Sequence, residues 1–279
     1  MTESERGELT RRAREIRETT LRAIHAVQTG HAGSSLSMVE LLTILYFRHL
    51  RYDVRNPRWP ERDHFLLSKG HGAPGLYATL AHAGFFPLDE MLTLRRLGSR
   101  LQGHPNANDL PGLDASLGSL GQGLSVAVGL ALGFKLQGRA NRVYCLLGDG
   151  ELQEGQNWEA MMAAAGLGLG ALVAIVDRNG LQNDGDTEQI VPLGDLAAKA
   201  RAFGWRTWTV DGHDFEALDR ALAEAVAPAP APAMLIARTV KGKGVSYMEG
   251  VVKWHHHPIN DAELAHAMRD LREGHQGWS

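Results

Sequence analysis

Two short apolar stretches of the chain each end in residues that can hold a hard cation. Residues 143–147 lead into Gly148-Asp149-Gly150, and residues 171–176 lead into Asp177-Arg178-Asn179. Magnesium takes oxygen ligands, commonly one or two carboxylates, and leaves its other positions to phosphate and water. Asp149 would supply the charge, while the Asn179 amide oxygen and the Leu181 main-chain carbonyl would supply neutral ligands. The two glycines let the backbone turn sharply and approach a phosphate.

A helix-length segment rich in Ala and Met separates the two stretches. The order strand, helix, strand predicts a βαβ unit. A right-handed crossover places the carboxyl ends of both parallel strands on one edge of the sheet, where ligands bind in open α/β folds. The two motifs are therefore expected to face one crevice. Taken alone, Gly-Asp-Gly is also typical of a plain strand-to-helix turn.

The rest of the chain continues the alternation of strands and helices. The patterns predict one α/β domain over residues 1–279, a doubly wound, mostly parallel sheet with helices on both faces. A Pro/Ala-rich connection is expected at 226–233. The expected strands are 65–68, 207–210 and 234–237, and the expected helices are 7–27, one ending at Phe47, 76–83, 124–136, 193–203, 215–226 and one from Asp261.

Composition excludes several classes of protein. Of the 279 residues, 44% are hydrophobic, which is enough for one large core. The formal charge is −3, so the chain lacks the excess of basic residues that is typical of nucleic-acid-binding proteins. Cys145 lies in an apolar strand and is expected to be a packed thiol. No secretory segment precedes the polar start, and no apolar run reaches about 18 residues. A cytoplasmic protein without membrane contact is expected.

The motif region resembles the diphosphate-binding domain of the transketolases. GDGELQEGQNWEA at 148–160 and DRNGLQNDG at 177–185 carry the resemblance, which extends from about Arg14 to about Leu271. It implies thiamine diphosphate held through Mg²⁺, or Ca²⁺ or Mn²⁺ in its place. Asp149, Asn179 and the Leu181 carbonyl would be the metal ligands. Arg178 stands where full-length transketolases often carry an acid, a variant expected of a smaller, split form.

Four histidines match the catalytic histidines of that family. They are His31 in a small-residue loop, His71 in Lys-Gly-His-Gly, His104 in Gly-His-Pro and His255 after Trp254. Imidazoles suit proton transfer to and from sugar hydroxyls near neutral pH. The resemblance also places His71 and His255 on the cofactor. Three consecutive histidines at 255–257 raise a metal site as an alternative, but adjacent side chains diverge and rarely chelate one ion.

The resemblance assigns further residues to the cofactor. The sequence GSLGQG, residues 118–123, matches a loop whose backbone cradles it, although a flexible glycine linker is the plainer alternative. Glu154 matches an acid near a subunit contact, but an acid in a first helical turn also compensates the helix dipole. The cofactor-binding residues expected in this way are His71, Gly118, Ser119, Leu120, Gly150, Glu151, Asn179, Lys241 and His255.

Transketolases also need a pyrimidine-binding domain and a C-terminal domain, and too little chain follows Asn260 to form either. The expectation is therefore a partner chain carrying both, in an α2β2 heterotetramer that moves a two-carbon ketol unit from a ketose to an aldose, as sugar phosphates. The partner would hold most of the phosphate-binding residues. The alternatives are the α-subunit of a 2-oxo acid dehydrogenase, a transketolase specialised for an unusual sugar, and a non-catalytic cofactor-binding protein.

Overall fold

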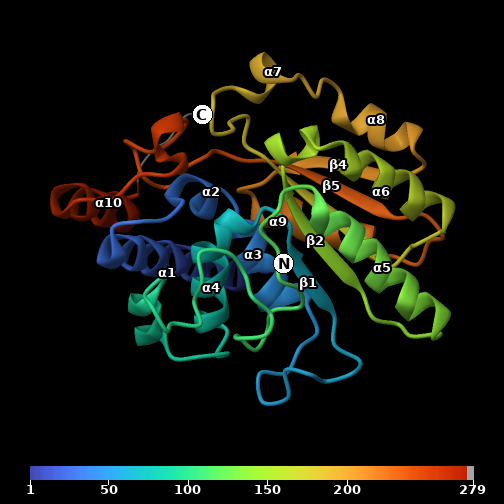
Figure 1. Ribbon diagram of the computed structural model, residues 1–279, viewed down its shortest axis with the longest axis horizontal. Coiled ribbons are helices and arrows are strands. Elements are labelled where there is room, and N and C mark those ends of the chain that lie inside the picture. Colours follow the sequence, from blue (N-terminus) through green and yellow to red (C-terminus); the bar gives the residue numbers. More distant parts are fainter. Residues whose placement is uncertain (275–279) are drawn as a thin grey trace.

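Five parallel strands form the centre of the computed structural model, which describes residues 1–274. Figure 1 shows the sheet between two layers of helices. All pairings among the strands are parallel, in the order β1-β2-β3-β5-β4. The predicted doubly wound α/β fold is thus confirmed. The strands are β1 (His64–Leu67), β2 (Val143–Gly148), β3 (Leu172–Arg178), β4 (Arg206–Asp211) and β5 (Ala233–Arg238).

The side chains of β2 alternate between two apolar cores, because successive residues of a strand point to opposite faces. Tyr144 and Leu146 join one core, while Val143, Cys145 and Leu147 join the other. A strand buried on both faces reads as an unbroken apolar run. This explains why the stretch shows no polar alternation, and why the Cys145 thiol is buried as expected.

Helices cover both faces of the sheet. One layer contains α1 (Glu3–Val27), α2 (Ala32–Ser37), α3 (Val39–Ile44), α4 (Ala73–His82), α9 (Phe215–Ala225) and α10 (Asp261–Glu273). The other contains α5 (Gln122–Leu136), α6 (Gly155–Gly166) and α8 (Leu196–Ala202), and the short α7 (Thr187–Ile190) follows β3. Within residues 1–274, no helix is long and apolar enough to cross a membrane.

Some helix boundaries differ from those expected. Helix α1 begins at Glu3 because Thr2 and Glu5 form a reciprocal capping box. Residues 32–37, expected to form a small-residue loop, fold into the short helix α2, and the helix expected to end at Phe47 is divided into α3 and a π-helical turn at Leu45–His49. The helix expected from residue 193 begins at Leu196, since the Asp195 carboxylate caps it by accepting from the Ala198 N–H at 2.8 Å.

The carboxyl ends of four strands meet at one edge of the sheet. Lys69 follows β1 and leads into a 3₁₀ turn at Gly70–Gly72, whereas Asp149 follows β2 and leads into a second one at Gly150–Gln153. Asn179 follows β3, and Thr239 follows β5. The βαβ argument correctly predicted that the two motifs share this edge.

Candidate active site

Asp149 and the segment after β3 are directly connected. Asp149 is 1% exposed, and its Oδ2 accepts hydrogen bonds from the Gly180 N–H at 2.6 Å and from Arg178 Nη1 at 3.0 Å. Its Oδ1 accepts from the Gly150 N–H at 2.9 Å. Burial raises the pKa of this carboxyl, and the nearby Asp177 adds to the rise. A buried, partly compensated carboxylate of this kind is suited to a cation.

The other two expected metal ligands lie beside it. Asn179 Oδ1 accepts from the Leu181 N–H at 3.1 Å, and Lys241 Nζ donates to the Leu181 carbonyl at 2.9 Å. Each of these oxygens has a second lone pair, so a metal ion is chemically compatible with them. Asp149, Asn179 and Leu181 all line one cavity of about 270 Å³.

That cavity contains most of the expected cofactor-binding residues. A second, larger cavity of about 490 Å³ lies at the opposite edge of the sheet, near Arg142 and Ala171 at the amino ends of β2 and β3, and contains none of them. We therefore place the site in the smaller one. The expected residues lining it are His71, Asp149, Gly150, Glu151, Leu120, Asn179, Leu181, Lys241 and His255.

Lys241 places a positive charge in this cavity. Its side chain is 1% exposed, and its Nζ also lies 2.8 Å from His255 Nδ1. Burial lowers the pKa of Lys241 to about 8, and the nearby charge of Lys69 adds to the effect. Within the described chain, no carboxylate forms an ion pair with this ammonium. A buried cation without a paired anion is an expected feature of a diphosphate site.

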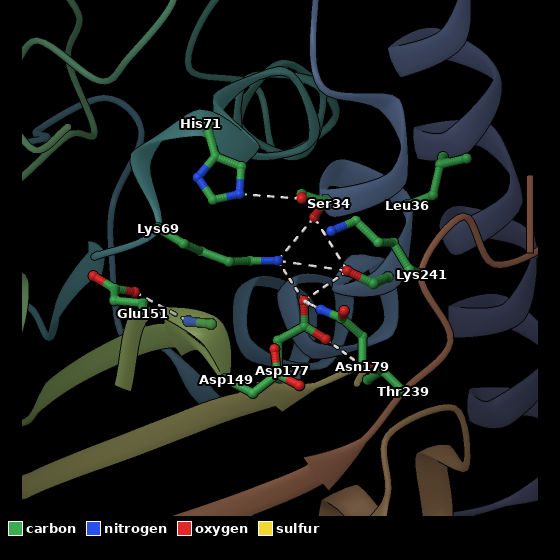
Figure 2. A network of polar contacts seen from close by, with 12 residues as sticks. Ser34, Leu36, Lys69, His71, Asp149, Glu151, Asp177, Asn179, Thr239 and Lys241 are labelled. Carbon is green, nitrogen blue, oxygen red and sulfur yellow. Dashed lines mark hydrogen bonds and ion pairs between the residues drawn. The ribbon is translucent and has the colours of Figure 1, made fainter. Parts of the chain in front are cut away.

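A second buried lysine was not predicted as a site residue. Lys69 forms an ion pair with Asp177, and Figure 2 shows its side chain reaching across the site to that carboxylate. Lys69 Nζ also donates to the Ser34 carbonyl at 2.9 Å, while Asp177 accepts from Ser37 Oγ at 2.6 Å and from the Thr239 hydroxyl. These bonds hold the ends of β1, β3 and β5 together. The sequence signal was a lysine just after one expected strand and an aspartate at the end of another.

Three of the four expected histidines form a cluster. The His31 ring centroid lies 5.2 Å from that of His71 and 5.5 Å from that of His255, and the latter two stack at 5.1 Å. Burial is the main cause that lowers their pKa values, to about 3 for His31, to about 4 for His255 and well below the usual value for His71. The rings are therefore neutral at pH 7. His71 Nε2 lies 3.1 Å from the Ser34 hydroxyl.

His104 lies apart from this ring cluster. It is close enough for its charge to contribute to the lowered pKa of His31, and its own pKa is lowered by burial and then by Arg95. A Cβ on Gly118 would lie 3.1 Å from the His104 ring, so the 118–123 loop packs on this histidine. Gly118 and Ser119 do not line the cavity, whereas Leu120 does.

Glu151 connects three segments of the site. Its carboxylate accepts from the Ser68 hydroxyl, from the Gly121 N–H at 2.9 Å and from the Gly148 N–H at 3.0 Å. Burial raises its pKa, and these donors oppose the rise. The geometry favours a role in holding β1, β2 and the start of α5 together, and the direct cofactor contact expected for Glu151 stays a prediction.

The three-histidine metal site gains no support. His256 packs on His31 with ring centroids 4.7 Å apart, whereas His257 packs on Trp254 at 5.3 Å. Over residues 1–274, no three His, Cys, Asp or Glu side chains are grouped so that they could hold a metal ion. The candidate magnesium ligands are one carboxylate with an amide and a carbonyl, which is a different donor set.

Comparison with known proteins agrees with this geometry. Residues 9–276 match the family described as transketolase, thiamine diphosphate binding domain. The chain is 43% identical over 266 residues to the 6-deoxy-6-sulfo-D-fructose transketolase subunit of Clostridium sp. strain MSTE9, covering 95% of this chain and 97% of that one. An apulose-4-phosphate transketolase subunit of Actinobacillus succinogenes is 43% identical over 244 residues, 88% of each chain.

Longer proteins match over part of their length. Human transketolase is 42% identical over 248 residues, which are 88% of this chain and 39% of the human protein. Among solved structures, transketolase from Leishmania mexicana has a TM-score of 0.89 at 32% identity, over 94% of this chain and 41% of that one.

Proposed function

The chain belongs to the transketolase family through its thiamine diphosphate-binding domain, and from this premise we propose that it works with a partner chain to move a two-carbon ketol unit from a ketose to an aldose. Two similar relatives that are named as subunits match it over 97% and 88% of their lengths. One domain over 1–279 would then bind the diphosphate, while a partner supplies the pyrimidine-binding and C-terminal domains in an α2β2 assembly.

The buried ammonium of Lys241 is the observation that carries the proposal. It lines the same cavity as the Gly148-Asp149-Gly150 turn, and it has no paired carboxylate within the described residues. The cavity volume of about 270 Å³ falls just below the lower end, about 300 Å³, of sites that enclose a whole small molecule. This size suits one end of thiamine diphosphate, with the other end held by the partner.

The residues present also suit a magnesium ion beside the diphosphate. A Cβ on Gly150 would lie 2.9 Å from Gln182 Cβ, so this tight turn has room only for glycine. Gln182 Oε1 is buried without a hydrogen-bond partner and belongs to the same cavity. In our proposal Asp149, Asn179 and the Leu181 carbonyl hold the ion, as expected from the sequence.

Bound thiamine diphosphate supplies a carbon nucleophile and an electron sink for carbon–carbon cleavage. The chain's own part is to orient the sugar and move protons. His31, His71 and His255 are neutral at pH 7 and can accept protons from sugar hydroxyls. His104, outside the ring cluster, would be a further substrate contact. Lys241 keeps His255 oriented through the 2.8 Å contact with its Nδ1.

Cofactor binding by purified chains tests the proposal. The chain and its partner, expressed separately and together, are titrated with thiamine diphosphate in the presence and absence of Mg²⁺ by calorimetry. We expect tight, Mg²⁺-dependent binding only to the assembled pair, and its loss in Asp149→Ala. Binding that needs neither the metal nor Asp149 would refute the assigned ligands, and no binding to the pair would refute the function.

A further inference from the structure

Arg95 carries a half-buried positive charge. Its Nη1 donates to the Thr29 hydroxyl at 2.9 Å, and within residues 1–274 it forms no ion pair. A guanidinium has five N–H donors in a rigid fork that matches oxyanions. Thr29 therefore holds the guanidinium in place through one hydrogen bond, and within residues 1–274 its other N–H donors are available to an oxyanion.

The backbone at Arg95 is held in an unusual conformation. Its φ is 58°, in the left-handed region that residues other than glycine seldom adopt. A Cβ on Gly103 would lie 2.8 Å from both Nε and Nη2 of Arg95, so the guanidinium lies directly over the backbone next to His104. Strain that is maintained in this way often accompanies a functional side chain.

His256 approaches the same point from the C-terminal part of the chain. Its Nε2 lies 3.3 Å from the Thr29 hydroxyl, to which Arg95 donates. Its ring centroid lies 4.7 Å from that of His31. Thr29 thus links two basic side chains that come from segments about 160 residues apart in sequence. His256 is exposed, so a ligand can reach it.

Arg95 and His256 lie on the far side of His31 from the cofactor cavity, as the contacts among the histidines indicate. His71 and His255 line the cofactor cavity, and His31 contacts both of their rings. Arg95 and His256 lie near His31 but do not line the cavity. A sugar whose reacting carbons lie in the cavity would pass His31, and its far end would reach Arg95 and His256.

The local charges favour an anion at that position. Burial lowers the pKa of His31, and the charges of His256 and Arg95 lower it further. The region around these side chains is therefore electropositive. An oxyanion would offset this charge through charge-assisted hydrogen bonds.

We infer that Arg95 and His256, linked by Thr29, form a subsite for the distal oxyanion of the sugar substrate, a phosphate or a sulfonate. The inference rests on the proposed function and adds a contribution from this chain to phosphate recognition, which the sequence assigned largely to the partner. The relatives from Actinobacillus and Clostridium are named for a sugar phosphate and a sulfonated sugar, and both substrates contain such a group.

The test compares three ketol donors with the same carbon skeleton in the assembled two-chain enzyme. The donors are D-fructose 6-phosphate, 6-deoxy-6-sulfo-D-fructose and neutral D-fructose, and the variants are Arg95→Gln, Arg95→Lys and His256→Asn. Arg96→Gln, an exposed neighbour, is the control. A charge-assisted hydrogen bond corresponds to about a 10- to 100-fold change in affinity.

We expect Arg95→Gln to raise KM for the preferred anionic donor by about tenfold or more. Its kcat and its KM for D-fructose should stay unchanged, and Arg95→Lys should restore part of the loss. His256→Asn should act in the same direction, and the better anionic donor identifies the oxyanion.

Equal KM increases for charged and neutral donors, or no increase, would overturn the subsite. A wild-type enzyme that transfers from D-fructose but does not favour an anionic donor would refute the subsite alone, whereas no transfer from any donor would refute the proposed function.

Discussion

Arg178 is the residue in which the site differs most from what a cation-binding site requires. Its Nη1 lies 3.0 Å from Asp149 Oδ2 and 2.8 Å from Thr187 Oγ1, and its other terminal nitrogen bonds to Glu188. A fixed positive charge beside a proposed metal ligand opposes the binding of a second cation. The carboxylate of Glu188 offsets this charge only in part, since it is more exposed than Asp149.

Replacing Arg178 by Met should therefore strengthen metal binding. We expect the assembled pair to bind Mn²⁺ about tenfold more tightly in Arg178→Met, since a charge pair at a few ångströms is worth about 1–4 kcal/mol near a protein surface. Electron paramagnetic resonance of free Mn²⁺ measures this directly. Arg220→Met, at an exposed position on α9, is the control. Weaker binding in Arg178→Met would instead show that Arg178 orients Asp149 for the metal.

The neutral histidines predict how stability depends on pH. His31 and His255 have pKa values of about 3 and about 4 in the folded chain, against about 6.5 when unfolded. Below pH 6.5 the unfolded chain binds protons that the folded chain does not, so these groups reduce stability as pH falls toward 4. Urea unfolding should show that the free energy of unfolding decreases less between pH 7 and pH 5 in the double variant His31→Asn/His255→Asn than in the wild type. Equal losses would contradict the pKa assignment.

The sequence predicts site residues that directly follow one strand, but not side chains from two different strands that form an ion pair. Asp149 and Asn179 could be predicted because each ends an apolar run and chemistry limits what magnesium accepts. The Lys69–Asp177 pair could not, since it depends on β1 and β3 lying on either side of β2 and on the burial of both charges. The position of Arg95 depends on a left-handed backbone that no pattern indicates.

At the scale of elements, α5 shows how the site is built into the sheet. Its first turn packs on the end of β1, where a Cβ on Gly123 would lie 2.8 Å from the Ser68 Cα. Ser68 and Gly121 both donate to Glu151. The start of α5 is thereby held to β1 and β2, while its remaining turns pack into the second core through residues such as Leu124 and Phe134.

Two glycines of α5 should consequently respond differently to the same substitution. Gly123→Ala should destabilise the chain by about 1–3 kcal/mol, because the new methyl group meets the Ser68 backbone. Gly129→Ala meets nothing within 4 Å and should stabilise the helix by about 0.5–1 kcal/mol. Chemical denaturation of the two variants measures both values. Similar effects at the two positions would show that the proposed contact between α5 and β1 is wrong.

The segment of residues 32–47 shows where element prediction failed. The small residues at 32–37 indicated a loop before a helix ending at Phe47, yet these residues form α2, and the chain turns between α2 and α3 at Met38, whose φ is −101°. The turn lets Ser34 and Ser37 reach Lys69 and Asp177. Tertiary contacts of the site thus override local preference, and a pattern within one segment does not contain them.

At the scale of the whole molecule, the outer sides of α5 and α6 expose apolar side chains. Val126 is 39% exposed and Met162 is 54% exposed, and both helices lie on one side of the sheet in Figure 1. A Cβ on Gly129 or Gly155 would meet nothing within 4 Å, so the chain itself does not require these glycines. In our proposal this face contacts the other chains of the assembly.

Acidic substitutions on this face should weaken assembly and leave the isolated chain folded. We expect Val126→Glu and Met162→Glu each to reduce association with the partner by about tenfold or more, since an unpaired charge in an interface costs about 2 kcal/mol or more. Leu88→Glu, in a 3₁₀ turn at Leu88–Thr93 that packs against α1 and α4, and 49% exposed, is the control. Analytical ultracentrifugation of the mixed chains gives the result. Unchanged assembly in both variants would place the partner on another face.

The most direct test of the whole account is a ketol-transfer assay on this chain, alone and with its partner, with thiamine diphosphate and Mg²⁺. We predict transfer from a ketose phosphate or sulfonate only when both chains are present, and its loss when Asp149→Ala replaces the wild-type chain. Transfer by either chain alone, or undiminished transfer by the Asp149→Ala pair, would contradict the account, as would an assembled pair that binds the cofactor but transfers no ketol unit.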